Sequence, residues 1–163
     1  MISIRKATLK DVPALVGLWK EFMKYHDEYI IKENPKLRTY LVKKKDAADN
    51  FRSYIRKNIR SKDAIVHIAE VNGKSAGYSL ISIVGNVPIF KIEKIGHLND
   101  LFVRKEFRGM RISSRFKDEA MEWFKRKGVK HISLKLYKDN RFAHSIYKRW
   151  GFFDYQTEMR REI

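Results

Sequence analysis

The stretch DLFVRKEFRGMRIS, residues 100–113, decides the fold. It joins the end of an apolar run to a segment with helical spacing, so it predicts a strand, a tight turn and a helix in direct succession. The free N–H groups at a helix N-terminus and the helix dipole together form an anion site. Arg108 and Arg111 add positive charge there. The turn therefore has the physical properties of a phosphate-binding turn.

The same turn contains one glycine, Gly109, where phosphate-binding turns usually contain two or three. A single Arg-Gly pair before a helix is a weak signal, and a purely structural turn is the alternative interpretation.

On both sides of this stretch, the hydrophobic spacing predicts strands and helices along the chain. A capping box at Thr8–Asp11 opens a helix that ends near His26. Asn72-Gly73-Lys74 is a hairpin signal between two apolar, β-branched runs. The predicted strands are 1–7, 64–71, 75–84, 95–103, 131–137 and a terminal pair, 151–155 with 158–162. The other predicted helices are 45–60, 112–127 and 140–149.

This order predicts a single domain over residues 1–163 with a three-layer α/β architecture. A mixed central β-sheet lies between helices, and its parallel part is the strand-helix-strand unit around 95–137. A chain of this length can bury roughly 70% of the surface that the extended chain exposes, which is enough for one core.

Composition points to an anionic ligand or partner. Lys and Arg number 36 against 19 Asp and Glu, a net charge of +17. A phosphorylated cofactor, an acidic protein or a nucleic acid fits this charge, and a heat-adapted surface is the alternative. The absence of cysteine excludes disulfides, thiolate metal sites and cysteine nucleophiles. No leader or bilayer-spanning run is visible, so we expect a soluble, cytoplasmic protein with no membrane partner.

A second motif, NRFAHSIYKRWGF at residues 140–152, gives the turn a specific meaning. With both motifs present, the sequence resembles the GNAT superfamily of acyl-CoA-dependent N-acyltransferases. IRKATLKDVPAL, residues 4–15, resembles the family's first strand and helix start. The stretch 100–113 resembles its central strand and acyl-CoA turn, usually Val-x(4)-Arg-Gly-x-Gly-x-Gly/Ala. Residues 140–152 resemble its Asn-x-x-Ala-x-x-x-Tyr-x-x-x-Gly-Phe helix, and the end of the central strand is most similar to the polyamine (diamine) acetyltransferase branch.

The resemblance implies that acetyl-CoA is a co-substrate. The strand residues that would bind the pantetheine arm through their backbone are Leu101, Phe102 and Val103. The residues that would surround the pyrophosphate are Arg108, Gly109, Met110, Arg111, Ile112, Ser113 and Ser114. Asn140 and Ala143 match positions that contact the lower arm. No spacing in the sequence indicates a metal site.

Two residues depart from the family pattern. Arg111 replaces the middle glycine and Ser113 the final Gly/Ala, so the backbone loses φ freedom and clearance for phosphate. If both residues adopt right-handed helical angles, their N–H groups point correctly, and Arg111 can bind phosphate bidentately. The alternatives are a turn blocked by its arginine and a degenerate domain that binds acyl-CoA without catalysis.

Catalysis by direct attack of an amine needs a base and an acid. A lysine-like amine with a pKa of about 10.4 must lose a proton before it attacks. Some relatives carry a glutamate where this sequence has Asn99, and an amide cannot act as a base. Asp100 is therefore the candidate base, with Glu93 in reserve. Tyr147 matches the family tyrosine that protonates the departing thiolate. The alternatives are a carboxylate satisfied by backbone at Asp100 and a core tyrosine at Tyr147.

The acceptor is expected to be a primary amine, either a small amine or polyamine or a protein lysine or N-terminus. The family's acceptor pocket lies against the loop between the first two helices, where we expect Tyr25–Tyr29 and Glu33. Asp27 and Glu28 are the candidate ligands for a cationic amine, and a solvated helix end is the alternative. The net charge disfavours long-range attraction of polyamines. A homodimer is common among relatives and is possible here.

The competing hypothesis is a protein associated with nucleic acid. Residues 36–62 contain ten Lys and Arg against Asp46 and Asp49. Arg52, Arg56 and Arg60 form a ridge on the predicted helix 45–60 that can follow phosphates. A solvated helix face is the alternative for this charge run.

Overall fold

The computed structural model describes residues 1–163. Its helices are α1 (Val12–Glu33), α2 (Ala47–Arg60), α3 (Ile112–Arg126) and α4 (Arg141–Arg149). Its strands are β1 (Ile2–Lys6), β2 (Ala64–Val71), β3 (Lys74–Gly85), β4 (Lys94–Val103) and β5 (Ile132–Leu134). None of the helices combines the length and the apolar character needed to cross a bilayer.

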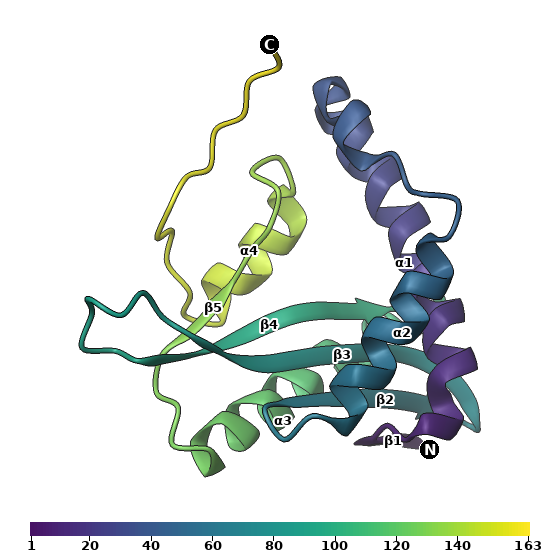
Figure 1. Ribbon diagram of the computed structural model, residues 1–163. Coiled ribbons are helices and arrows are strands. Elements are labelled where there is room, and N and C mark those ends of the chain that lie inside the picture. Colours follow the sequence, from purple (N-terminus) through teal and green to yellow (C-terminus); the bar gives the residue numbers. More distant parts are fainter.

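The five strands form one mixed sheet in the order β1-β2-β3-β4-β5. The first three pairings are antiparallel, and β4 pairs with β5 in parallel across the α3 connection. Helices α1 and α2 cover one face of the sheet and α3 covers the other (Figure 1). The predicted three-layer α/β fold with a mixed sheet is confirmed.

Both faces of the sheet bury apolar side chains. Between α1, α2 and the sheet lies a twelve-residue cluster that includes Leu15, Ile55 and Tyr78. On the α3 face, all five residues at helical spacing are buried, as the sequence predicts: Ile112, Phe116, Ala120, Trp123 and Phe124. The predicted hairpin also forms, because Asn72 and Gly73 adopt the positive φ values that a two-residue turn needs.

Strand β4 is paired on both sides for only part of its length. Asp100 lies opposite Leu80 and Leu98 opposite Ile81, so Asn99 has no partner on β3 and forms a β-bulge. Strand β5 pairs only with Gly96–Leu98. From Asn99 to Val103, the edge of β4 that faces away from β3 is therefore open.

The end of the first helix is a wrong prediction. Helix α1 continues past His26 to Glu33 and ends at Asn34, whose extended backbone precedes Pro35. No glycine or proline interrupts residues 26–33, so nothing stops the helix earlier. Tyr25–Tyr29 and Glu33 consequently lie on α1 and not in the connecting loop.

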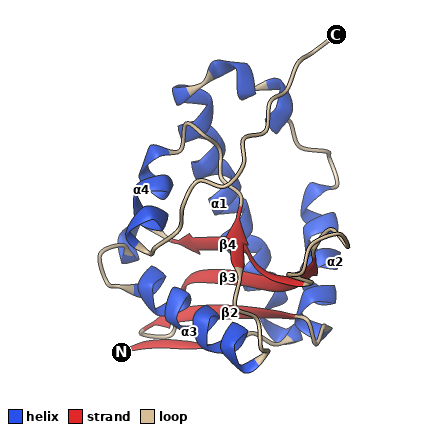
Figure 2. Cartoon of the chain, turned by 90° about the vertical axis from the view of Figure 1, so that its left-hand side faces the viewer, coloured by secondary structure: helices blue, strands red, loops and turns tan.

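The terminal strand pair is also wrong. Residues 151–163 form no strand, and β5 is three residues long where the prediction had 131–137. Figure 2 shows the segment after α4 as a continuous loop up to the C-terminus. Its alternating apolar side chains Phe153, Tyr155 and Met159 are exposed. The short β5 offers too little edge for them to pair with.

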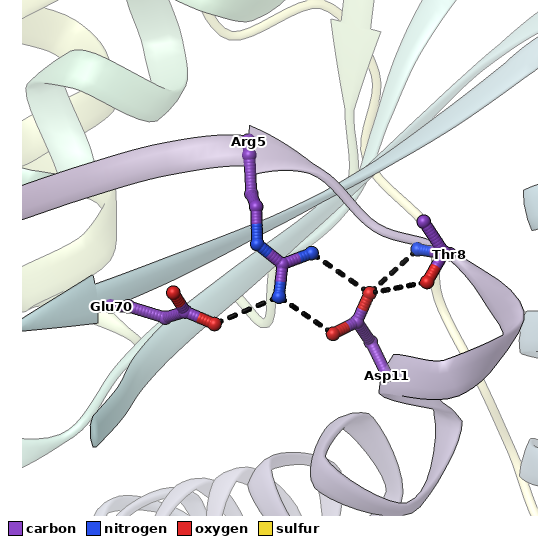
Figure 3. A network of polar contacts seen from close by, with 4 residues as sticks. All are labelled: Arg5, Thr8, Asp11 and Glu70. Carbon is purple, nitrogen blue, oxygen red and sulfur yellow. Dashed lines mark hydrogen bonds and ion pairs between the residues drawn. The ribbon is translucent and has the colours of Figure 1, made fainter. Parts of the chain in front are cut away.

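A polar network ties β1 to the start of α1 and to β2 (Figure 3). The Arg5 guanidinium donates to both carboxylate oxygens of Asp11, at 2.9 and 2.7 Å, and to Glu70 at 2.8 Å. The N–H and hydroxyl of Thr8 donate to Asp11 at 2.7 and 3.0 Å, which forms the predicted capping box. The Arg5 guanidinium, with help from Thr8, holds the pKa of Asp11 well below its usual range.

We predict that Asp11→Ala lowers the free energy of unfolding by roughly 1 kcal/mol near neutral pH, because a cap and its ion pair are lost. The folded-state pKa of Asp11 lies below that of the unfolded chain. Its contribution is therefore complete above about pH 4 and disappears as the pH falls through the folded-state pKa. Urea denaturation over this range measures the effect. Asp63→Ala, at an exposed site, is the control, and an unchanged difference down to acidic pH contradicts the prediction.

Candidate functional site

A cavity of about 770 Å³ opens where β4 and β5 diverge. Its walls come from α1, the connection after α1, the C-terminal half of β4, the start of α3, the residues after β5, and α4. Most lining side chains are apolar. Elements distant in the sequence thus enclose one site around the open edge of β4.

The structure brings most of the predicted cofactor residues to this cavity. The residues that line it are Leu101, Phe102, Val103, Arg108, Gly109, Arg111, Ile112, Ser113, Asn140 and Ala143. Met110 and Ser114 do not line it. The strand, the turn and the α4 motif therefore meet at one place, as the resemblance implies.

The turn before α3 uses two left-handed residues. Gly109 has φ 82° and Arg111 has φ 59° and ψ 17°. Right-handed helical angles at both Arg111 and Ser113 were the condition for N–H groups that point toward the phosphate. Ser113 lies within α3 and has them, whereas Arg111 is left-handed and does not. A left-handed conformation costs a residue with a side chain roughly 1–2 kcal/mol. The position thus keeps the backbone that favours glycine while it carries an arginine.

The two turn arginines have different surroundings. Arg108 donates to the Tyr25 hydroxyl at 2.8 Å and to the Val103 carbonyl at 3.2 Å, and its guanidinium lies 4.3 Å from the centre of the Tyr25 ring. These contacts fix Arg108 between α1 and β4. The Arg111 side chain is exposed and makes no hydrogen bond or ion pair within the chain, so it is free to meet an anion. Tyr25 is a site residue whose partnership with Arg108 the sequence did not indicate.

Helix α4 carries the other half of the motif. The Asn140 side chain caps the helix by accepting from the Ala143 N–H at 3.1 Å. Tyr147 lies one turn further on, against the rings of Trp150 and Phe152. Burial raises the pKa of Tyr147, and the negative charge of Asp100 raises it further. Tyr147 and Asp100 thus line the same cavity and interact electrostatically.

Asp100 accepts a hydrogen bond from a second tyrosine. The Tyr78 hydroxyl donates to Asp100 Oδ2 at 3.0 Å, and Tyr78 itself is fully buried. Burial raises the pKa of Asp100, while the hydrogen bond from Tyr78 lowers it. The carboxylate is held by a side chain and not by backbone, and it faces the cavity. The sequence places Tyr78 in the strand predicted over residues 75–84 but gives no sign of its contact with Asp100.

Glu93, the reserve base, does not join Asp100 and Tyr147, and neither do His97 and His144, two histidines that lie close to the motifs in the sequence. Glu93 is exposed in the hairpin between β3 and β4. His97 contacts the Ser133 hydroxyl at 2.9 Å, and His144 pairs with Asp154 at 2.6 Å. None of the three lines the cavity. Asn99 does line it, and its Oδ1 accepts from Ser82 at 2.8 Å.

Only one carboxylate of the acidic cluster on α1 reaches the cavity, and it is already paired. Asp27 lines the cavity but pairs with Lys43 and lies 3.2 Å from His26 Nδ1. Glu28 is exposed and does not line the cavity. Of the two residues predicted to bind a cationic amine, only Asp27 is in place, and a lysine already compensates its charge.

Comparison with known proteins assigns the fold and the family. The Acetyltransferase (GNAT) family model matches residues 19–152. An uncharacterised N-acetyltransferase of Methanocaldococcus jannaschii is 28% identical over 150 residues, which are 92% of this chain and 60% of that protein. This chain thus spans about three fifths of that relative's length.

Solved structures show the same fold. A Bacillus halodurans protein, solved as a tetramutant, has a TM-score of 0.82 at 22% identity, with 99% of each chain covered. A predicted acetyltransferase from Clostridium acetobutylicum, solved with acetyl-CoA, has a TM-score of 0.74 at 19% identity, with 99% of this chain and 96% of that chain covered. With a family model that matches most of its length, this chain belongs to the acetyltransferase (GNAT) family.

The left-handed conformation of Arg111 leads to a stability prediction. We expect Arg111→Gly to be more stable than Arg111→Ala by about 1 kcal/mol, because glycine adopts φ 59° without strain and alanine does not. Thermal and urea denaturation of the two variants measure the difference. Equal stabilities, or a more stable alanine variant, contradict it. The same pair at Ser113, which is helical, is the control, and there alanine is expected to be the more stable.

Proposed function

We propose that this protein is an N-acetyltransferase that moves an acetyl group from acetyl-CoA to a primary amine. The observation that supports this most is one arrangement: an open strand edge, a cationic helix N-terminus, and a half-buried carboxylate and tyrosine, all on one cavity. The family membership of the chain agrees with it.

The residues of the cavity fit acetyl-CoA. From Asn99 to Val103, β4 has unpaired backbone groups on its outer edge, which an extended pantetheine arm can match as an added strand. The start of α3 supplies N–H groups for a pyrophosphate, and Arg111 adds a guanidinium with no other partner. When bound, acetyl-CoA supplies the acetyl group as an activated thioester.

Asp100 is suited to accept a proton. Its carboxylate is half-buried beside Tyr78 and faces the cavity, so an incoming ammonium group can transfer its proton to it directly or through water. Ionised Asp100 is needed for this role. The hydrogen bond from Tyr78 favours the ionised form against the effect of burial.

Tyr147 is suited to donate a proton. Its raised pKa keeps the hydroxyl protonated at neutral pH, so it can protonate the departing sulfur. The backbone N–H groups at the open edge of β4 offer stabilisation for negative charge on the acetyl oxygen. The proton acceptor lies on β4 and the proton donor on α4. The fold brings these two elements, which are distant in the sequence, to the same cavity.

We predict that Tyr147→Phe lowers kcat by roughly 10²- to 10⁴-fold, the range for loss of a general acid, and leaves acetyl-CoA binding within a few-fold of the wild type. Turnover is measured by release of free thiol, and binding by calorimetry. Tyr155→Phe, in the exposed C-terminal segment, is the matched control. Unchanged turnover, or loss of binding along with turnover, counts against the assigned role.

A second prediction concerns pH dependence. Activity should rise with pH as Asp100 ionises, because only the carboxylate accepts a proton. Tyr78→Phe removes the hydrogen bond that lowers the pKa of Asp100, so the acidic limb of the kcat/KM profile should move to higher pH. Asp100→Asn should abolish this limb. A limb that stays in place in Tyr78→Phe assigns it to another group.

A further inference from the structure

A second hollow lies between α1 and α2 and leads to the candidate active site. It has a volume of about 380 Å³. Its lining residues are Trp19, Val42, Lys43, Lys44, Ala47, Asn50, Phe51 and Tyr54, and we call it the α1–α2 groove. Val42 and Lys43 line both this groove and the main cavity. The two hollows therefore share a wall.

The floor of the α1–α2 groove is aromatic, and Tyr78 lies between this floor and Asp100. Trp19 and Phe51 stack with their ring centres 4.7 Å apart. The Phe51 ring lies 6.3 Å from that of Tyr78, whose hydroxyl binds Asp100. Burial raises the pKa of Tyr54, a lining residue of the groove, and the charge of Asp100 raises it further. Because Tyr78 is fully buried and fills the space in between, a chain in the groove reaches Asp100 only across the shared wall at Val42 and Lys43, where the main cavity begins.

The segment that forms one side of the groove, residues 36–62, is rich in cations, and two of them, Lys43 and Lys44, line the groove itself. The segment 36–62 that forms one side carries ten Lys and Arg, and only Lys43 and Arg52 have a carboxylate partner. The other eight, which include Lys44 on the groove itself, have no ion-pair partner in the structure. Asp27, the acidic residue at the shared wall, is already paired with Lys43. This surface attracts negative charge and repels polycations.

We propose that the α1–α2 groove binds the chain that carries the acceptor amine, and that this chain is an acidic peptide segment. The inference rests on the proposed function, since it takes Asp100 as the proton acceptor. It names the acceptor as a protein amine flanked by carboxylates and not as a polyamine. The amine is neutralised at Asp100, while flanking Asp or Glu side chains meet the cationic side of the groove at Lys44.

The groove favours a peptide over a nucleic acid. A peptide carries the amine that the site needs, at an N-terminus or a lysine, whereas the bases and phosphates of nucleic acids offer no aliphatic amine. The groove also adjoins the main cavity, which Asp100 lines, and it has apolar side chains on its floor. A single-stranded nucleic acid would need free aromatic faces for its bases, whereas the Phe51 ring is buried and already stacked on Trp19.

The test compares acceptors that differ only in charge. Two short peptides each have a free N-terminus and one lysine, with Asp and Glu flanking the amine in one and Asn and Gln in the other. Spermidine is the third acceptor. We expect kcat/KM to be highest for the acidic peptide, and its advantage to shrink with added salt. An equal rate for the neutral peptide, or preference for spermidine, overturns the proposal.

Matched variants locate the effect. Lys44→Glu, on the groove, should lower kcat/KM for the acidic peptide by about fivefold more than it changes kcat/KM for the neutral peptide. Lys57→Glu makes the same charge change on α2 away from the groove lining and should act much less. Equal effects of the two variants would show that only the overall charge matters and would overturn the groove.

Binding of a labelled acidic peptide is measured by fluorescence anisotropy. It tests peptide binding in the groove independently of acetyl transfer. An acidic peptide that binds in a Lys44-dependent way without being acetylated contradicts the proposed function and supports the groove. Acetylation with no preference for acidic flanks contradicts the groove and supports the proposed function. An RNA oligonucleotide that displaces the peptide through Lys44 with higher affinity identifies nucleic acid as the occupant and overturns the proposal.

Discussion

The site depends on one feature of the sheet: β4 is paired on both sides only as far as Leu98. The bulge at Asn99 shifts the register with β3, and β5 ends at Leu134, so the last residues of β4 keep one free edge. The close approach of β3 to this half-free strand requires glycine at position 77, since a Cβ there would lie 2.3 Å from the Phe102 carbonyl oxygen. The open edge, the cavity and the approach of α4 all follow from this divergence.

Charge on this chain has two separate uses around the opening. At the start of α3, Arg111 stands in the left-handed conformation that suits glycine, so a side chain that costs backbone energy is retained where a pyrophosphate would lie. On the other side, the cationic segment 36–62 leaves most of its charges unpaired along the α1–α2 groove. A half-buried carboxylate, Asp100, lies between them and is held by Tyr78. This arrangement suits an anionic donor and an acceptor whose amine alone is positive.

Local sequence signals predicted the elements with strong patterns, and tertiary contacts explain the rest. The hairpin at Asn72, the buried face of α3 and the meeting of the turn with Asn140 and Ala143 were predictable from spacing and motif. The length of α1 was missed, although Pro35 was the available stop signal. The terminal strands were wrong because alternation makes a strand only where the segment pairs with another strand, and residues 151–163 pair with none. The Tyr78–Asp100 bond joins residues 22 positions apart through the strand register, which the sequence does not specify.

Hydrogen–deuterium exchange of the wild-type protein with and without acetyl-CoA tests the central claim most directly. If the free edge of β4 and the start of α3 bind this molecule, amides of residues 99–103 and 109–115 should gain protection together, because both lose their access to water on binding. The edge of β1, on the opposite side of the sheet, should not change. Protection of α3 alone, of another surface, or of no segment at saturating acetyl-CoA would contradict the claim.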